Sequence, residues 1–187
     1  AMNQFEVEFF GKTAHSAGDP WQGRSALDAI ELADIGLNFL REHLKPTARI
    51  HYVIRDGGEA PNVVPDYARA WYYVRDIDRE SVDKNYEWVL KVIEGAAMMS
   101  GTTCKVRFRS GVHEMLPNRA GSEVVYSNLL LVGAPGFTAE EKSFAKEIQK
   151  SLGVEEKGLS TKIEPFSLPE KSWGSGSTDV AEVSWLT

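Results

Sequence analysis

The residue best placed to do chemistry in this chain is His15, which lies in a loop of small residues, Gly11-Lys12-Thr13-Ala14-His15-Ser16-Ala17-Gly18. The loop follows a strand-like stretch and precedes a capped helix start. Its small neighbours cannot bury the imidazole, and a histidine can donate a hydrogen bond or a proton near neutral pH. The sequence therefore predicts a presented histidine, with an ordinary surface histidine as the alternative.

Two other polar side chains stand at positions that suit an anionic ligand. Asn62 lies in a loop bordered by prolines, so its amide could be a rigid donor to a carboxylate or an oxyanion, or simply a turn residue. Arg75 lies near the end of a strand-like stretch, where it could bind a substrate carboxylate or be a solvated charge. Together with His15, they favour a site for a negatively charged ligand.

Other kinds of site find less support. The remaining histidines are scattered without a metal-ligand spacing, so we expect no metal site within this chain: His43, His51 and His113. The turn at residues 174–179 lacks the lysine and the spacing of a phosphate-binding loop. A nucleophilic triad is disfavoured because no nucleophile elbow accompanies the candidate side chains, which are His15, Ser16, Ser177 and Asp179.

Composition narrows the class of protein further. The 187 residues are 42% hydrophobic and 26% charged, which is typical of a globular domain with a real core. A net charge of −6 without a basic stripe argues against a nucleic-acid partner, and no apolar run is long enough to cross a membrane. Cys104 is the only cysteine and no signal peptide is visible, so we expect a cytoplasmic protein.

Hydrophobic periodicity predicts the elements that position these residues. Four strands and two helices are expected over residues 4 to about 116, at 5–9, 26–44, 49–55, 67–76, 78–101 and 104–109. The β-α-β-β-α-β order predicts an α+β, ferredoxin-like fold, in which both helices cover one face of a four-stranded antiparallel sheet. The open face is expected to carry Glu6, Glu8, Arg69, Trp71 and Tyr73. Two further helices are expected at 122–132 and 138–152, followed by a loop at 153–176.

Three motifs together resemble a known family. The His15 loop with Pro20, then Asn62-Val63-Val64-Pro65, then Arg75 thirteen residues after Asn62, is similar to the lid or dimerisation domain of the zinc-dependent aminoacylase and carboxypeptidase-G superfamily. Residues 176–180 (Gly-Ser-Thr-Asp-Val) and 183–185 (Val-Ser-Trp) look closest to its aminobenzoyl-glutamate hydrolase branch, of the B-subunit type. The turn at residues 116–118 (Leu-Pro-Asn) also fits that branch.

The resemblance implies a catalytic domain that binds two zinc or other divalent ions, with a ferredoxin-like lid inserted into it. The family's ion ligands are not visible in this sequence. We therefore expect a piece of such an enzyme, without a cofactor of its own and inactive alone. Residues 3–117 would be the lid or dimerisation domain, and residues 118–187 a partial segment of the catalytic domain.

The resemblance also implies roles for the three candidate residues. His15 would reach into the partner subunit's site and stabilise the oxyanion of a tetrahedral intermediate, while Asn62 and Arg75 would bind the substrate's free carboxylate. The expected enzyme is a zinc-dependent amidohydrolase that cleaves an N-acyl or aminobenzoyl-glutamate-type amide and forms a homodimer through its lid. The alternative is a non-catalytic, ferredoxin-like dimerisation or ligand-binding module.

Overall fold

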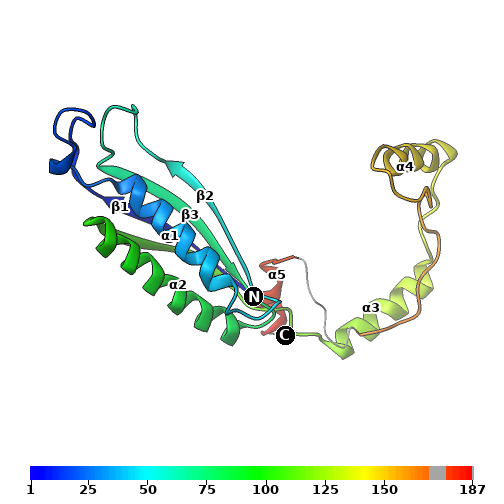
Figure 1. Ribbon diagram of the computed structural model, residues 1–187. Helices are drawn as coiled ribbons and strands as arrows, with labels where there is room; N and C mark the ends of the chain where they lie inside the picture. The colour runs from blue at the N-terminus through cyan, green and yellow to red at the C-terminus, as the bar shows by residue number, and fades with distance from the viewer. Residues whose placement is uncertain (169–175, 187) are drawn as a thin grey trace. The chain divides into compact units, whose positions relative to one another are not determined.

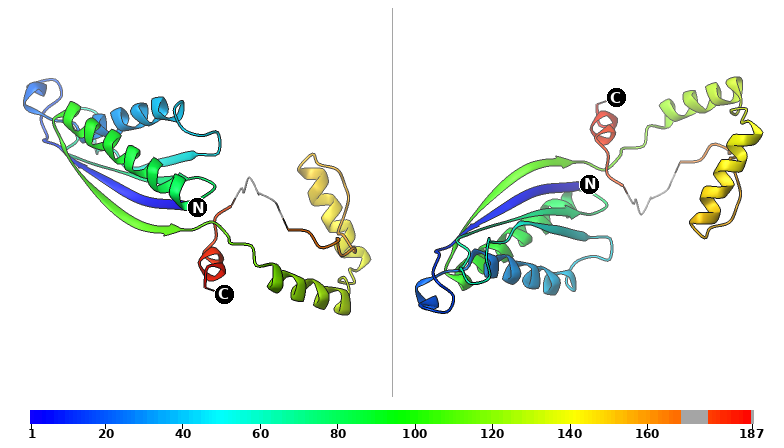
Figure 2. Two further views of the ribbon diagram at one scale, coloured as in Figure 1. Left: turned by 90° about the horizontal axis from the view of Figure 1, so that it is seen from below. Right: turned by 90° about the horizontal axis from the view of Figure 1, so that it is seen from above.

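A four-stranded antiparallel sheet with two long helices on one face forms the main part of the structure (Figure 1). The computed structural model describes residues 1–168 and 176–186. Its first elements, in chain order, are β1 (Met2–Phe10), α1 (Ala26–Arg41), β2 (Arg49–Asp56), β3 (Tyr67–Arg75), α2 (Arg79–Ser100) and β4 (Thr103–Val112). The strand order β2-β3-β1-β4 and the position of both helices on the same side confirm the predicted α+β, ferredoxin-like fold (Figure 2).

Packing divides the described residues into two compact units. The first comprises residues 1–116 together with residues 176–186, and the second lies within 117–172. The division into domains at residues 117 and 118 stays a prediction. No helix in the described ranges is long and apolar enough to cross a membrane.

The second unit contains the two later helices that the sequence predicts, α3 (Arg119–Val132) and α4 (Ala139–Ser151). Helix α3 begins slightly earlier than expected because the Asn118 side chain caps it, accepting a hydrogen bond from the Gly121 amide at 2.8 Å. Thr138 and Glu141 form the predicted capping box of α4. Residues 155–168 contain no helix or strand, as expected for a loop.

The core of the first unit lies between the two helices and one face of the sheet. Strict alternation along β1 and β3 points every second side chain at the helices, and the Phe5 and Tyr72 rings stack with their centres 5.4 Å apart. The apolar stripe of α1 completes this core. The largest fully buried side chains of the whole core are Tyr72, Phe5, Phe9, Ile30, Leu37, Ile93, Val7 and Val74.

The helix boundaries show where sequence patterns are sufficient and where they are not. Asp78 caps α2 by accepting from the Ser81 amide at 2.7 Å, and Gly101 ends that helix at φ 67°, both as predicted. The prediction that α1 continues to Leu44 is wrong, because the helix ends at Arg41. The next three amides bond to carbonyls three residues back, which tightens the chain into turns.

The open face of the sheet carries a network of ion pairs. Glu8 accepts hydrogen bonds from Arg107 and from the Tyr67 hydroxyl, the latter at 3.1 Å, and the Arg107 contact lowers the pKa of Glu8. Glu6 pairs with Arg69 and with Arg109. The Arg55 guanidinium lies 4.7 Å from the centre of the Trp71 ring. These contacts agree with the prediction that the open face carries Glu6, Glu8, Arg69 and Trp71.

Candidate functional site

Two loops at one end of the sheet are joined by backbone hydrogen bonds and together carry His15 and Asn62. The Gly11 amide donates to the Asp66 carbonyl at 2.7 Å, and the Val64 amide donates to the Ala14 carbonyl at 2.9 Å. The Ser16 amide donates to the Asn62 carbonyl at 3.0 Å. The loop at 11–25 is therefore fixed against the loop at 57–66, although neither forms a regular strand.

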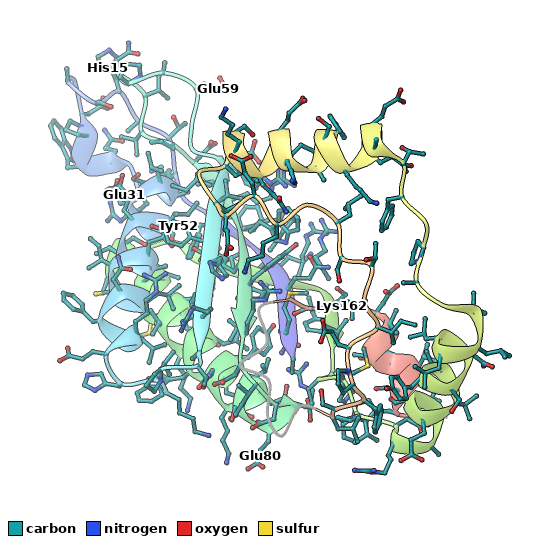
Figure 3. All side chains as sticks on the ribbon, turned by 90° about the vertical axis from the view of Figure 1, so that its right-hand side faces the viewer. His15, Glu31, Tyr52, Glu59, Glu80 and Lys162 are labelled. Carbon is teal, nitrogen blue, oxygen red and sulfur yellow. The ribbon has the colours of Figure 1, made fainter. Side chains whose placement is uncertain are left out.

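His15 lies at the tip of this pair of loops, next to the loop that carries Glu59 (Figure 3). Its Nδ1 atom accepts hydrogen bonds from the amides of Ala17 at 3.2 Å and Gly18 at 3.0 Å. The His15 carbonyl in turn accepts from the Asp19 amide at 3.2 Å. The ring is thus anchored through Nδ1, and within residues 1–168 and 176–186 no hydrogen bond engages its Nε2 atom.

Glycines explain why the chain can fold so tightly at this point. Lys12 and Arg24 exchange two backbone hydrogen bonds of 2.8 Å, which bring the two ends of the loop together. A Cβ atom on Gly11 would lie 1.9 Å from the Arg24 carbonyl oxygen. A Cβ on Gly23 would lie 3.0 Å from the Val64 side chain. Only glycine fits at position 11, and position 23 is also crowded.

Asn62 is brought next to His15, as the anionic-ligand hypothesis needs. His15 and Val63 form an isolated antiparallel bridge, so Asn62 lies one residue from the position directly opposite His15. The Asn62 side chain is exposed, and its backbone carbonyl is held by the Ser16 amide. The imidazole and the carboxamide therefore share one end of the sheet.

Arg75 lies at the opposite end of the sheet. Strand β3 begins at Tyr67, directly after the Asn62 loop, and Arg75 is the last of its nine residues. At a rise of about 3.3 Å per residue, Arg75 is about 26 Å from the start of the strand. Its Nη2 atom donates to the Ser177 hydroxyl at 2.9 Å. A single copy of this chain therefore does not bring Arg75 together with His15 and Asn62.

The surroundings of Arg75 include a short helix that the sequence patterns did not predict, α5 (Val180–Ser184). The Trp185 indole N–H donates to the Glu114 carbonyl at 2.8 Å, and the Leu116 amide donates to the Ser184 hydroxyl at 2.8 Å. Residues 183–185, which the family resemblance singled out, thus contact the segment that follows β4.

A histidine–carboxylate pair next to α5 was also not predicted from the sequence. The His113 Nδ1 atom lies 3.0 Å from both carboxylate oxygens of Glu182, and the His113 amide donates to Glu182 Oε1 at 2.7 Å. These hydrogen bonds, that of the amide first, lower the pKa of Glu182. The two residues are 69 positions apart, so spacing alone carried no signal for the pair.

A cavity of about 430 Å³ lies beside the His15 loop. Its wall is mostly apolar, and Asp28 and Glu59 add carboxylates, with Ser16 and Ser25 adding hydroxyls. The cavity extends from the N-terminus of α1 to the loop that carries Asn62. It gives this end of the sheet a concave surface next to the presented histidine.

The remaining hypotheses fare differently. Ser177 contacts Arg75, at the far end of the sheet from His15, which agrees with the argument against a nucleophilic triad of these residues. The first residues of the turn at 174–179, considered for a phosphate, lie outside the described residues. Across residues 1–168 and 176–186, no group of three or more His, Cys, Asp or Glu side chains could hold a metal ion.

Known proteins with similar sequences point to one family. Residues 2–97 match the family described as the peptidase dimerisation domain. A p-aminobenzoyl-glutamate hydrolase subunit of Escherichia coli (strain K12) is 36% identical, over 97% of this chain and 43% of its own length. The Xaa-Arg dipeptidase of Homo sapiens is 33% identical, over 74% of this chain and 35% of its own length. The chain thus spans less than half the length of these relatives.

The solved structures agree with the sequences. The crystal structure of an aminobenzoyl-glutamate utilization protein from Klebsiella pneumoniae matches with a TM-score of 0.59 at 26% identity. The match covers 74% of this chain and 35% of that one. The sequence and the fold therefore agree that the sheet and its two helices resemble the peptidase dimerisation domain.

Proposed function

Since this chain belongs to the family of M20 peptidase dimerisation domains, we propose that it is one part of a metal-dependent amidohydrolase. The proposed substrate is an N-acyl or aminobenzoyl-glutamate-type amide with a free carboxylate. Support comes from two relatives whose names contain aminobenzoyl-glutamate, one of them part of a hydrolase and 36% identical. The dipeptidase relative supports the wider class of amide hydrolysis.

The observation that carries the proposal is the division of the candidate residues between the two ends of one sheet. His15 and Asn62 share the loop end, whereas Arg75 is about 26 Å away by strand rise. One substrate can contact all three only if two copies of the chain contribute to its site. In the proposed homodimer, one subunit supplies His15 and Asn62 and the other supplies Arg75.

Each side chain then has a role that suits its chemistry. The imidazole of His15 donates to the oxygen that becomes negative as the amide is attacked. Asn62, at the same end of the sheet, offers a neutral amide donor to the substrate's free carboxylate. The Arg75 guanidinium binds the substrate carboxylate through a charge-assisted pair of hydrogen bonds. The two zinc ions stay an expectation for the longer protein, with ligands outside this chain.

The sheet offers an edge for the homodimer. The Tyr52, Val53 and Ile54 side chains of edge strand β2 are all exposed, and a free apolar edge favours pairing with another strand. The opposite edge strand, β4, carries Lys105, Arg107 and Arg109, and the two arginines pair with Glu8 and Glu6 of the neighbouring strand β1. We therefore assign pairing between copies to β2, related by a two-fold axis.

A substrate pair tests the proposed function directly. The longer protein, loaded with zinc, is expected to cleave p-aminobenzoyl-glutamate and to cleave the analogue whose α-carboxylate is an amide much more slowly. Arg75→Met should lower kcat/KM for the acid on the order of 100-fold, because a charge-assisted hydrogen bond is lost, and change the amide little. Equal losses on both substrates would show that Arg75 does not bind the carboxylate.

The alternative function is a non-catalytic dimerisation or ligand-binding module in a cytoplasmic protein. It predicts no cleavage of either substrate with metal present, while ligand binding and dimerisation are retained. The same experiment therefore separates the two functions, with product release measured by chromatography.

A further inference from the structure

We propose that residues 15–18 form a clamp that fixes His15 as a neutral hydrogen-bond donor through its Nε2–H group. This inference rests on the proposed function for the identity of the acceptor, an oxygen that gains negative charge. Ala17 and Gly18 are the positioning residues, and they act through their backbone amides. The clamp itself is a property of this chain and is testable without activity.

The geometry of the ring nitrogens leads to this assignment. Two N–H groups point at the same Nδ1 atom, from Ala17 at 3.2 Å and from Gly18 at 3.0 Å. An amide N–H can only donate, so Nδ1 must supply the lone pair and carries no proton in this arrangement. In a neutral imidazole the proton then resides on Nε2.

The assignment decides which kinds of chemistry His15 can perform. A protonated Nε2 has no lone pair, so it cannot take a proton from a water molecule or ligate a metal ion while the clamp is closed. It can donate one hydrogen bond to an oxygen held in front of it. Among the roles that a loop histidine can take, the clamp thus selects stabilisation of an oxyanion.

The clamp is supported from outside by the paired loops. The amide of Ser16, which is part of the clamp, donates a hydrogen bond to the Asn62 carbonyl at 3.0 Å. The Asp19 amide donates to the His15 carbonyl at 3.2 Å. A Cβ atom on Gly18 would meet the His15 ring at ordinary contact distances, the closest being 3.6 Å to Nδ1. Gly18→Ala therefore keeps both the amide donor and the space for the ring.

Long-range ¹H–¹⁵N spectroscopy of the 187-residue chain at pH 8 tests the tautomer. We expect His15 to show an unprotonated Nδ1 and a protonated Nε2, without the mixture of tautomers that a free imidazole shows. The exposed His43 is an internal control, since its ring makes no hydrogen bond within the described ranges. A protonated Nδ1 at His15, or the same mixture as at His43, would overturn the proposal.

Two substitutions of His15 distinguish the effect of the clamp from the effect of the Nε2–H donor. In His15→Asn the side-chain oxygen can accept from the amides two and three residues on, as in an Asx turn, so the clamp is kept. The Nε2–H donor is lost, because the shorter carboxamide places its own N–H group where the ring carbon Cδ2 stood and does not reach the position of Nε2. In His15→Ala both are lost. Hydrogen exchange at the Ala17 and Gly18 amides should therefore stay slow in the asparagine variant and accelerate at least about tenfold in the alanine variant.

Activity of the longer protein completes the test. Both variants should lose about 10²–10³-fold in kcat, the effect of removing one oxyanion donor, although only the alanine variant loosens the loop. Wild-type kcat in the asparagine variant would contradict the donor role. If the spectra show the expected tautomer but no variant affects catalysis, the clamp stands and the proposed function of His15 fails.

Discussion

Asp34 offers a quantitative test of how the first unit is packed. The residue is 6% exposed, and its carboxyl group accepts a hydrogen bond from the Tyr72 hydroxyl of the sheet at 3.0 Å. Burial raises the pKa of Asp34 from its ordinary value of 3.8 to about 6, against the opposing effect of the Tyr72 hydrogen bond. The folded protein therefore binds this proton more tightly than the unfolded chain does.

The sign and size of the effect follow from this difference in pKa. Because the raised pKa belongs to the folded state, the contribution of Asp34 to stability is largest below pH 4 and is lost as the pH rises through about 6. The full difference is about 3 kcal/mol, of which about 2 kcal/mol falls between pH 4.5 and pH 8. Asp34→Asn removes the titration but keeps an oxygen that can accept from Tyr72.

Urea unfolding of the wild type and of Asp34→Asn at pH 4.5 and pH 8 measures this contribution. The free energy of unfolding of the variant, relative to the wild type, should rise by about 2 kcal/mol between the two pH values. Glu87→Gln, a matched change at an exposed position of α2, serves as the control and should show no such change. An unchanged difference for Asp34→Asn would refute the assignment of a buried, titrating carboxyl group.

Two further predictions concern the loop and the dimer edge. Gly11→Ala should lower the free energy of unfolding by about 1–3 kcal/mol because its Cβ would overlap the Arg24 carbonyl. Gly95→Ala, in the open middle of α2, should raise the free energy of unfolding by up to about 1 kcal/mol. Chemical denaturation measures both, and equal effects would contradict the close approach at Gly11. Val53→Lys should shift sedimentation equilibrium toward monomers by placing two like charges together across the two-fold axis, while Thr103→Lys on β4 should not. A dimer that is weakened by Thr103→Lys and not by Val53→Lys would place the interface on strand β4.

The fold was predictable because the alternation in the strands, the apolar stripes of the helices and the helix caps all indicate the same elements. Alternation in β1 and β3 fixed both faces of the sheet, and the caps at Asp78 and Thr138 marked helix starts correctly. The end of α1 was not predictable from its stripe, since Leu44 continues the apolar period and still packs on the core. Only the turn bonds after Arg41 show that the helix has already ended.

The candidate site was predictable in its residues and less so in its arrangement. The small-residue loop and the prolines near Asn62 marked two presented side chains, which the structure places together. Their separation from Arg75 follows from the length and direction of β3 and cannot be read from residue types. The contact of His113 with Glu182 depends on a return of the chain over 69 residues, which leaves no local pattern.

A subunit-mixing experiment tests the central claim, that His15 and Asn62 act across the dimer while Arg75 acts within its own subunit. His15→Ala and Arg75→Ala forms of the longer protein, each expected to lose activity at least about 100-fold, are mixed and allowed to exchange subunits. Half of the dimers are then hybrids in which one of the two sites is intact, so about a quarter of wild-type activity should return.

The control mixes His15→Ala with Asn62→Ala. Both changes lie at the same end of the sheet, so every site in the hybrid lacks one of the two residues and activity should stay absent. Recovery of about a quarter in the first mixture and none in the second is the predicted result. No recovery in the first mixture, with subunit exchange verified by mass spectrometry, would contradict the composite site.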